Sequence, residues 1–357
     1  MKIAAYLYNL SGGGAEKIML NFLNYVAENT EHNVTLILSK KEGQYLPIVS
    51  ARVKIFSLNK SGSFSSLPAL HSYLKNHPPD VLYSTLTNGN ILSILVGQLL
   101  NIKVIIREAN TMNEFSKSEK KIVDKVSMKL IQYLYKYAYK CIAISEIVKK
   151  DLLKFTNIPE QKIEVIHNPI IVNTDIEKTD VELAKDKFHI CFVGRLSAQK
   201  NIKTIALLVE HFAKTNANIV FHFFGEGEEK YLLEEIVVKY NCSENIILHG
   251  FNLSFYSYLT NMDLFIHIPL WEGFGNSVLE AFNSGIPMIL SNVESGYAEL
   301  IKSDHSNVHY VEPMAKEKVI AIINDYVTGK NQRLSGRILI DRPNDVVSQC
   351  YLSLALN

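Results

Sequence analysis

The chain has 357 residues, of which 47% are hydrophobic and 20% charged. Its length predicts two or three domains, and its composition excludes intrinsic disorder and a collagen-like or coiled-coil fibre. Because 37 basic residues balance 36 acidic ones, the net charge of +1 gives no general attraction to nucleic acid. We therefore expect no nucleic-acid partner, and any basic function must be local.

Cysteine usage and the apolar runs favour a soluble, cytoplasmic protein. The 4 cysteines are far apart and contain no CxxC pair, so neither a disulfide framework nor a zinc site is expected. The first apolar run, residues 3–8, is too short for the core of a signal peptide. The longest run, residues 91–106, is broken by glycine and polar residues, which predicts a buried helix followed by a strand instead of a membrane span.

Short β-branched and aromatic runs alternate with helical patterns along nearly the whole chain. Most of these runs are apolar without alternation, as in parallel strands that are covered on both faces. Repeated strand–helix–strand order then predicts an α/β fold with doubly wound parallel sheets. The expected strands are 2–8, 34–38, 53–58, 80–84, 103–106, 141–144, 163–166, 188–193, 219–224, 245–249, 263–268, 286–290 and 308–311, and the helical patterns include 14–29, 89–99, 146–155, 200–214, 228–240 and 277–284.

A polar stretch without a sustained period, residues 171–187, is the expected linker between the domains. It separates a first domain, residues 1–170, from a second, residues 188–340. The last segment, residues 341–357, has no strand left to pair with, and we expect a helix that crosses back to the first domain. Ligands of such sheets bind outside the carboxyl ends of the strands, so residues that directly follow strands are the candidates for function.

Several familiar motifs are absent, which narrows the chemistry. The glycine-rich turn at 11–14 lacks the third glycine of GxGxxG, because Lys17 occupies that position. The sequence also contains no P-loop, no GxSxG, no HExxH and no pair of aspartates separated by one residue. We therefore expect an anion to be held without a metal.

The strongest feature is the segment Glu272 to Glu280, which follows an expected strand and leads into a helix. Glycines let the backbone approach a ligand closely, and a helix N-terminus attracts phosphates or sugar hydroxyls. Both glutamates can accept hydrogen bonds from one ligand. A capping box of Ser277 and Glu280 is an alternative explanation for the second glutamate, but not for the first.

A second feature is Gly194-Arg195, after the strand 188–193, with Lys200 five residues further on. A rigid guanidinium and a flexible ammonium at a strand end suit a diphosphate. The alternative is that both are ordinary solvated surface charges, which is the default for isolated cations.

Taken together, these residues resemble glycosyltransferase family 4, a large group of GT-B enzymes. The resemblance covers most of the chain and rests on the order of its motifs. They are the turn Ser11 to Glu16, Asn168-Pro169, Gly194-Arg195-Leu196 with Lys200-Asn201, Gly225-Glu226-Gly227-Glu228, Asp263, and the E-x7-E segment Glu272 to Glu280.

The resemblance implies a GT-B fold, with two facing Rossmann-like domains and a nucleotide sugar held mainly by the second. It assigns the donor sugar to Glu272, the nucleotide ribose to Glu280, and the diphosphate to Arg195 and Lys200, so that Glu272, Arg195 and Lys200 are the catalytic candidates. The remaining donor-binding candidates that it implies are Gly12, Gly13, Gly14, Gly194, Gly225, Gly227, Gly273, Phe274, Gly275, Asn276 and Ser277. It also implies retention of anomeric configuration, with no metal and no cofactor.

One position departs from the family pattern. Where many relatives carry a histidine near the donor sugar, this chain has Ala109. Its neighbours Glu108 and Asn110, together with Asn168, are candidates for the cleft or the acceptor site. A plain ion pair of Arg107 with Glu108 at the strand end is the alternative.

Residues 117–140 contain seven lysines against Glu119 and Asp124, a local net charge of +5. Lys117, Lys121, Lys125 and Lys129 step by four along one ridge of an expected helix, beside an apolar ridge of Ile122, Val126, Leu130, Leu134 and Ala138. Tyr133, Tyr135, Tyr137 and Tyr139 add amphipathic rings. Either the segment lies on an anionic membrane or holds a lipid diphosphate, or it is the solvated face of a core helix.

These observations lead to one favoured hypothesis and two alternatives. The favoured one is a retaining glycosyltransferase that moves a hexose or N-acetylhexosamine from a nucleotide sugar, expected to be a UDP-sugar, to a glycan or polyprenyl-diphosphate-linked acceptor. Its expected setting is bacterial surface polysaccharide synthesis at the cytoplasmic face of the inner membrane. The alternatives are a GT-B sugar-nucleotide epimerase and a non-catalytic sugar-nucleotide binding module.

Overall fold

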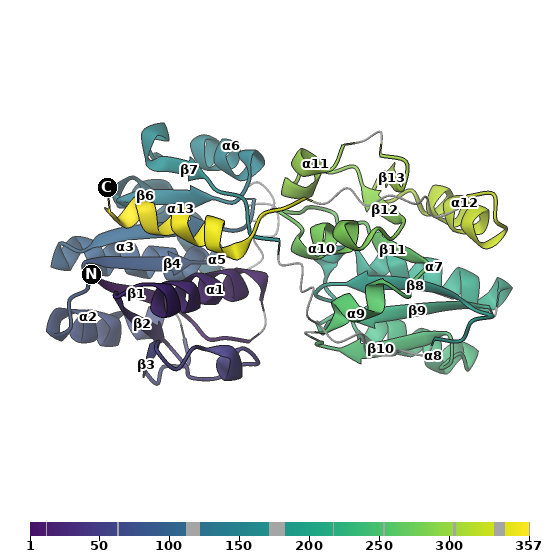
Figure 1. Ribbon diagram of the computed structural model, residues 1–357, viewed down its shortest axis with the longest axis horizontal. Coiled ribbons are helices and arrows are strands. Elements are labelled where there is room, and N and C mark those ends of the chain that lie inside the picture. The colour runs from purple at the N-terminus through teal and green to yellow at the C-terminus, as the bar shows by residue number, and fades with distance from the viewer. Residues whose placement is uncertain are drawn as a thin grey trace. The chain divides into compact units, whose positions relative to one another are not determined.

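The computed structural model describes residues 1–11, 13–62, 64–111, 122–170, 183–216, 218–252, 254–302, 305–331 and 340–356, with the backbone alone for 122–126. The chain divides into two compact units (Figure 1). Unit 1 comprises residues 1–169 and 342–357, and unit 2 comprises residues 170–341. Gly12, Lys117, Lys121 and most of the expected linker lie outside the described residues, as does the side chain of Lys125.

In the described part of unit 1, 7 parallel strands form a single sheet in the order β3-β2-β1-β4-β5-β6-β7. The order runs outward from β1 in both directions, which defines a doubly wound sheet with a reversal point between β1 and β4. The strands are β1 (Lys2–Leu7), β2 (Asn33–Leu38), β3 (Lys54–Ser57), β4 (Val81–Thr85), β5 (Lys103–Glu108), β6 (Lys140–Ala143) and β7 (Ile163–Val165).

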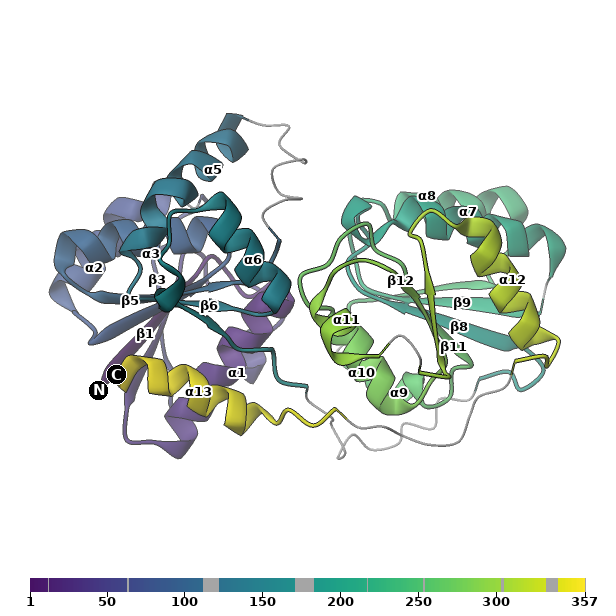
Figure 2. The same ribbon diagram turned by 90° about the horizontal axis from the view of Figure 1, so that it is seen from above.

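Helices cover both faces of this sheet. Helices α1 and α13 pack together on one face, and α2, α3 and α5 lie on the other (Figure 2). The C-terminal helix α13 therefore returns to unit 1, as predicted. The helices of unit 1 are α1 (Gly14–Asn29), α2 (Leu67–Asn76), α3 (Thr87–Leu100), α5 (Ile122–Leu134), α6 (Glu146–Phe155) and α13 (Asn344–Leu356).

The described part of unit 2 repeats the plan with 6 parallel strands in the order β10-β9-β8-β11-β12-β13. Helices α7, α8 and α12 cover one face, and α9, α10 and α11 cover the other (Figure 2). The strands are β8 (Phe188–Val193), β9 (Ile219–Phe224), β10 (Ile246–Gly250), β11 (Leu264–His267), β12 (Met288–Ser291) and β13 (Val308–Val311). The helices are α7 (Ile202–Thr215), α8 (Tyr231–Tyr240), α9 (Phe255–Leu259), α10 (Asn276–Ser284), α11 (Gly296–Leu300) and α12 (Lys316–Val327).

The predicted α/β class and every expected strand are confirmed, each strand within two residues of its expected bounds. The apolar run 91–106 forms α3 and β5, as expected, and no described helix is long and apolar enough to cross a membrane. Four helices were not among those expected. Two of them, α9 and α11, have only 5 residues each, which is too short for a helical period to show. The third, α2, has Pro68 in its first turn, and the fourth is α12.

The predicted basic helix over 117–140 is partly wrong. Helix α5 ends at Leu134, a 3-10 turn covers Tyr135–Tyr137, and β6 already begins at Lys140. The expected apolar ridge is displaced by one residue, because Met128, Ile131 and Tyr135 are buried whereas Leu130 and Leu134 are only half-buried. Tyr135 is fully buried and is therefore no surface ring.

Candidate active site

The donor-side candidates lie directly after the carboxyl ends of adjacent strands in unit 2. Gly194 follows β8, Gly225 follows β9, and Glu272 follows β11. Strands β8 and β11 are hydrogen-bonded neighbours at the point where the strand order reverses. Doubly wound sheets bind their ligands in the crevice outside this reversal point. The fold therefore brings together, within one unit, residues that are almost eighty positions apart in the sequence.

The glycines after β8 and β9 allow their turns to touch. The amide of Gly194 donates to the carbonyl of Phe224 at 2.9 Å. A Cβ on Gly225, whose φ is +147°, would lie 2.0 Å from the carbonyl oxygen of Gly194. A side chain at that position would thus force the two turns apart, so Gly225 is required by backbone packing.

The loop after β11 enters helix α10 through Gly275, which is the N-cap residue with a φ of +83°. The capping box predicted as an alternative does not form, because Ser277 lies inside the helix and its hydroxyl donates to the carbonyl of Val193 at 3.0 Å. Ser277 thereby fixes the start of α10 against the end of β8. Glu280, half-buried on α10, is left without the capping explanation.

Glu272 is the centre of a buried ionic cluster, with 7% of its surface exposed. The ammonium of Lys200 forms an ion pair with its Oε2 atom. The ring of His267, the last residue of β11, donates from Nε2 to the same oxygen at 3.0 Å. The other oxygen, Oε1, accepts no hydrogen bond from a described residue. This geometry leaves one carboxylate oxygen available to a ligand.

The charges in this cluster stabilise one another. Burial alone would raise the pKa of Glu272, but Lys200 and His267 lower it to about 2, so the carboxylate is ionised. Burial, and then the charge of Lys200, lower the pKa of His267. A neutral ring that donates from Nε2 has an acceptor at Nδ1, and this buried atom has no partner among the described residues.

The two residues that are predicted to bind the diphosphate, Lys200 and Arg195, differ in their surroundings. The side chain of Lys200 is only 14% exposed and is paired, so its interpretation as a solvated surface charge is wrong. Arg195 is exposed and forms no ion pair with any described residue, so both of its interpretations stay open. Phe274 and Gly273 are buried in the loop, and the amide of Gly296 donates to the carbonyl of Gly273 at 3.1 Å.

In unit 1, Arg107 and Glu108 are both buried, but they do not pair with each other. Arg107 donates to the hydroxyl of Tyr351 at 3.0 Å and to the side chain of Asn168. Glu108 accepts from the hydroxyl of Tyr135 at 2.8 Å. Successive residues of a strand point to opposite faces, so the plain ion pair predicted as an alternative is wrong.

The remaining candidates of unit 1 are placed as follows. Asn110 is exposed just beyond β5, and Asn168 is buried against Arg107. Gly13 is the N-cap of α1, whose first residue is Gly14. Burial raises the pKa of Glu108, with Tyr135 opposing it. Glu108 and Asn168 thus make structural contacts within unit 1, and their roles toward an acceptor stay predictions.

Two residues of interest were missed from the sequence. His267 is a lone histidine at the end of an otherwise apolar strand, which is the signal that could have identified it. Leu86, at the carboxyl end of β4, has a φ of +67°, although leucine has no preference for that region. Strained backbone of this kind is concentrated at functional sites. No pattern in the sequence predicts the positive φ of Leu86.

The chain matches two family models that together span most of its length. Residues 12–174 match "Glycosyltransferase Family 4", and residues 173–337 match "Glycosyl transferases group 1". The chain is a group 1, family 4 glycosyltransferase. Of the three functions considered above, membership supports the transferase over the epimerase and the non-catalytic module.

Curated relatives of this glycosyltransferase carry related names. One from Campylobacter jejuni, 27% identical over 320 residues that cover 85% of this chain and 84% of the relative, is an N-acetylgalactosamine-N,N'-diacetylbacillosaminyl-diphospho-undecaprenol 4-alpha-N-acetylgalactosaminyltransferase. One from Escherichia coli, 24% identical over 366 residues that cover 92% of this chain and 91% of the relative, is a UDP-Gal:alpha-D-GlcNAc-diphosphoundecaprenol alpha-1,3-galactosyltransferase.

Solved structures support the GT-B fold. Anabaena HepE in complex with UDP and glucose matches with a TM-score of 0.79 and 18% identity, covering 100% of this chain and 99% of that one. WaaG, a glycosyltransferase involved in lipopolysaccharide biosynthesis, matches with a TM-score of 0.76 and 14% identity, covering 98% of this chain and 95% of that one. Among the described residues, no group of three or more His, Cys, Asp or Glu side chains is placed to hold a metal ion.

Proposed function

We propose that this glycosyltransferase transfers a hexose or N-acetylhexosamine from a UDP-sugar to a polyprenyl-diphosphate-linked glycan, with retention of anomeric configuration and without a metal. The names of the relatives from C. jejuni and E. coli support the acceptor class, since both specify a diphospho-undecaprenol substrate. The HepE complex with UDP and glucose supports the donor class. The process would be bacterial surface polysaccharide synthesis at the cytoplasmic face of the inner membrane.

The observation that carries the proposal is the Lys200–Glu272–His267 cluster beside the N-terminus of α10. As the sugar–phosphate bond breaks, negative charge develops on the leaving diphosphate. The ammonium of Lys200, the guanidinium of Arg195 and the positive end of the α10 dipole would stabilise that charge. The open Oε1 atom of Glu272 would accept a hydroxyl of the donor sugar, and Glu280 would accept the ribose hydroxyls.

The described end of α5 supports contact with an anionic membrane surface. Lys129 is exposed, and the rings of Tyr133 and Tyr137 are 62% and 47% exposed. Basic residues beside amphipathic rings suit the headgroup region of a bilayer. Lys129→Glu is expected to reduce co-sedimentation with anionic vesicles but not with neutral ones. Equal loss with both kinds of vesicle would contradict an electrostatic contact.

A screen of UDP-, GDP- and ADP-sugars for hydrolysis and for transfer to a polyprenyl-diphosphate-linked glycan tests the proposed function. We expect UDP-sugars to be used, with product of the same anomeric configuration as the donor and no loss of rate with EDTA. Lys200→Ala and Glu272→Gln should each lower the rate by about 100-fold or more, because each removes charge stabilisation or a donor contact.

Lys203→Ala is the matched control, since Lys203 is an exposed lysine on α7 three residues from Lys200. It should keep the wild-type rate. Wild-type turnover of the Lys200→Ala protein, while its thermal unfolding stays normal, would exclude the proposed role of the cluster.

A further inference from the structure

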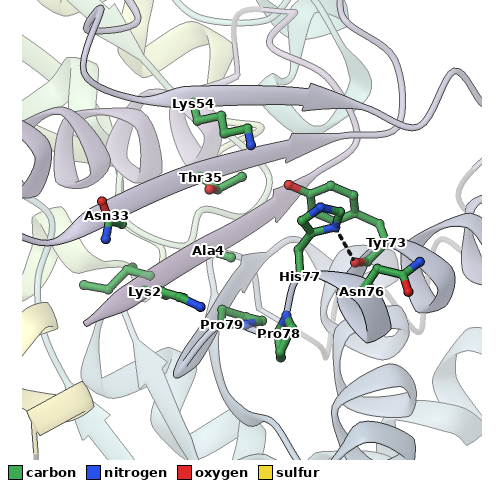
Figure 3. Close-up of a pocket in the computed structure, with 11 residues that line it drawn as sticks. Lys2, Ala4, Asn33, Thr35, Lys54, Tyr73, Asn76, His77, Pro78 and Pro79 are labelled. Atoms are coloured by element: carbon green, nitrogen blue, oxygen red, sulfur yellow. Dashed lines mark hydrogen bonds between the residues drawn. The ribbon is translucent and has the colours of Figure 1, made fainter.

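Unit 1 contains a pocket at the amino-terminal ends of its strands, opposite to their carboxyl ends (Figure 3). It lies where β1, β2 and β3 begin and where α2 ends, and its volume is about 340 Å³. That volume is at the lower end of the range for small-molecule sites, roughly 300–1,000 Å³. The usual ligand of a doubly wound sheet binds outside the carboxyl ends of the strands, so this pocket is separate from the site described above.

The pocket exists because the helix stops before it covers the sheet. Helix α2 ends at Asn76, and Pro78 and Pro79 follow, which cannot continue a helix. Beneath this end, the sheet presents the small side chains of Ala4 and Thr35, which are paired across β1 and β2. Neither residue fills the space that a longer helix would have covered.

The lining of the pocket is cationic. Lys2 and Lys54 belong to it, no aspartate or glutamate does, and neither lysine forms an ion pair with a described residue. Asn33, Thr35 and Asn76 add neutral groups that can donate hydrogen bonds. The carboxylate of Asp80, outside the lining, is occupied by the backbone amide of Lys2 at 2.7 Å. The surroundings therefore favour an anion.

Tyr73 contributes a hydroxyl group to the pocket. It is 9% exposed, and its ring is stacked between Phe56 and His77, at centroid distances of 3.9 and 4.8 Å. Its hydroxyl forms no hydrogen bond with any described residue. Figure 3 shows this hydroxyl and the Lys54 ammonium directed toward the same space. Burial raises the pKa of Tyr73, so the hydroxyl keeps its proton and can donate it.

One carbonyl at the negative end of α2 is already capped. The carbonyl of Tyr73 already accepts two hydrogen bonds from His77, one from the backbone amide at 2.9 Å and one from Nδ1–H at 3.2 Å. Because a carbonyl can only accept, His77 carries its proton on Nδ1. The last turn of the helix thus has one carbonyl capped by the side chain that closes the pocket.

We propose that this pocket binds the phosphate group of a small phosphorylated ligand, with Lys54 and the Tyr73 hydroxyl as its main donors. The phosphate would come either from a free sugar phosphate or nucleotide, or from the diphosphate headgroup of a lipid. The proposal does not depend on the donor site of unit 2. It adds a second anion site, which lies in unit 1 at the amino-terminal ends of the strands.

Isothermal titration of the full chain with inorganic pyrophosphate tests this site, in a Lys200→Ala background that weakens the proposed donor site. Lys54→Gln should weaken the affinity about tenfold, since a charge-assisted hydrogen bond is lost. Tyr73→Phe, which keeps the ring stack, should weaken it severalfold. Lys75→Gln is the control, because Lys75 is an exposed lysine of α2 outside the lining, and should leave the affinity unchanged.

A second titration uses phosphatidylcholine vesicles with and without polyprenyl diphosphate. Binding of free pyrophosphate supports a soluble ligand, and binding restricted to vesicles with the diphosphate, lost in Lys54→Gln, supports a lipid headgroup. The proposal is overturned if neither probe binds, or if Lys54→Gln and Tyr73→Phe bind both as well as Lys75→Gln does. Thermal unfolding of each variant confirms that a lost affinity is not a lost fold.

Discussion

At the scale of single residues, the Lys200–Glu272–His267 cluster shows how a charge is kept inside a protein. Burial of a carboxylate is unfavourable unless donors compensate for the lost water. Lys200 and His267 both meet the Oε2 atom, and together they hold the pKa of Glu272 at about 2. Because the compensation is concentrated on one oxygen, the other stays available to a ligand without a change in the charge state of the site.

A second histidine cluster of unit 2, of which His189 and His222 are buried and His249 is half-buried, lies away from the site. His189, His222 and His249, on β8, β9 and β10, form a chain with ring nitrogens 2.9 and 3.0 Å apart. His189 donates from Nε2 to the carbonyl of Ala184 at 3.0 Å, so its Nδ1 must accept from His222, and His222 in turn accepts from His249. All three rings satisfy this pattern in the neutral state.

This histidine chain predicts a loss of stability in mild acid. Burial, and then His189 and His249, lower the pKa of His222 to about 3, whereas the unfolded chain has a pKa of about 6.5 there. Above the unfolded value the ring is neutral in both states. As the pH falls below it, only the unfolded state gains the proton, so the free energy of unfolding should decrease by about 2 kcal/mol between pH 7 and pH 5.

Urea unfolding at both pH values measures this effect. The His222→Asn protein should lose correspondingly less stability between pH 7 and pH 5 than the wild type, while His211→Asn, at a half-buried histidine of α7, should behave like the wild type. An equal pH dependence of His222→Asn and the wild type would contradict the prediction.

The residue scale also shows what a single sequence can reveal. The sequence points to Glu272 and Lys200 because glycines and strand ends mark their positions, and the structure pairs their side chains. Their catalytic roles stay predictions. The position of His267 at the end of an apolar strand is a weak signal, since a histidine there is more often a core residue and its contact with Glu272 depends on the turn between them. The capping role of Ser277 was wrong, because the backbone of Gly275 takes the N-cap position in a conformation that sequence spacing does not show.

At the scale of elements, helix α10 depends on the glycine that begins it. Ala at position 275 would need the same φ of +83°, and its Cβ would lie 2.6 Å from the ring of Tyr297, which is fully buried. Gly329 is a matched control, with a φ of +75° and no atom within 4 Å of such a Cβ. The comparison separates the cost of the backbone conformation from the cost of the contact.

We expect Gly329→Ala to lower the free energy of unfolding by about 1 kcal/mol, for the left-handed backbone alone. Gly275→Ala should cost about 2 kcal/mol more, because overpacking is added. Denaturant unfolding of both proteins measures the difference. Equal costs would mean that Tyr297 moves aside freely and that α10 is not held by this contact.

Helix boundaries were harder to predict than strands. Buried parallel strands appear as apolar runs whatever their neighbours, so β1 to β13 could be located directly. The buried face of the segment around α5 was harder to predict, because Tyr135, just beyond the helix, is buried. Its hydroxyl donates to Oε2 of Glu108 at 2.8 Å. A tyrosine in a lysine-rich segment resembles a surface ring until the buried carboxylate across from it is known.

At the scale of the whole molecule, the chain leaves unit 1 after Pro169 and returns to it as helix α13. Tyr351 of α13 is fully buried beside Phe22, with ring centroids 5.5 Å apart. Its hydroxyl accepts from Arg107, and its carbonyl accepts from the hydroxyl of Tyr83 at 2.7 Å. Unit 1 is therefore assembled from the two ends of the sequence, which explains why the last segment had no strand of its own to pair with.

Tyr351 is consequently expected to control the stability of unit 1 although only six residues follow it in the sequence. Tyr351→Phe leaves the buried Nε of Arg107 without its acceptor and should cost about 2 kcal/mol. Tyr351→Ala adds a cavity against Phe22 and should cost about 4 kcal/mol in total. Cys350→Ala, at the exposed neighbouring position, should stay within about 0.5 kcal/mol of the wild type.

Hydrogen exchange of the β1, β4 and β5 amides, together with denaturant unfolding, assigns these losses to unit 1. The strands of unit 2 should keep their protection in the same proteins, since Tyr351 and its hydrogen-bond partners Tyr83 and Arg107 belong to unit 1. If Tyr351→Phe were as stable as Cys350→Ala, Arg107 would have to find another acceptor. The returning helix would then contribute apolar packing alone to unit 1.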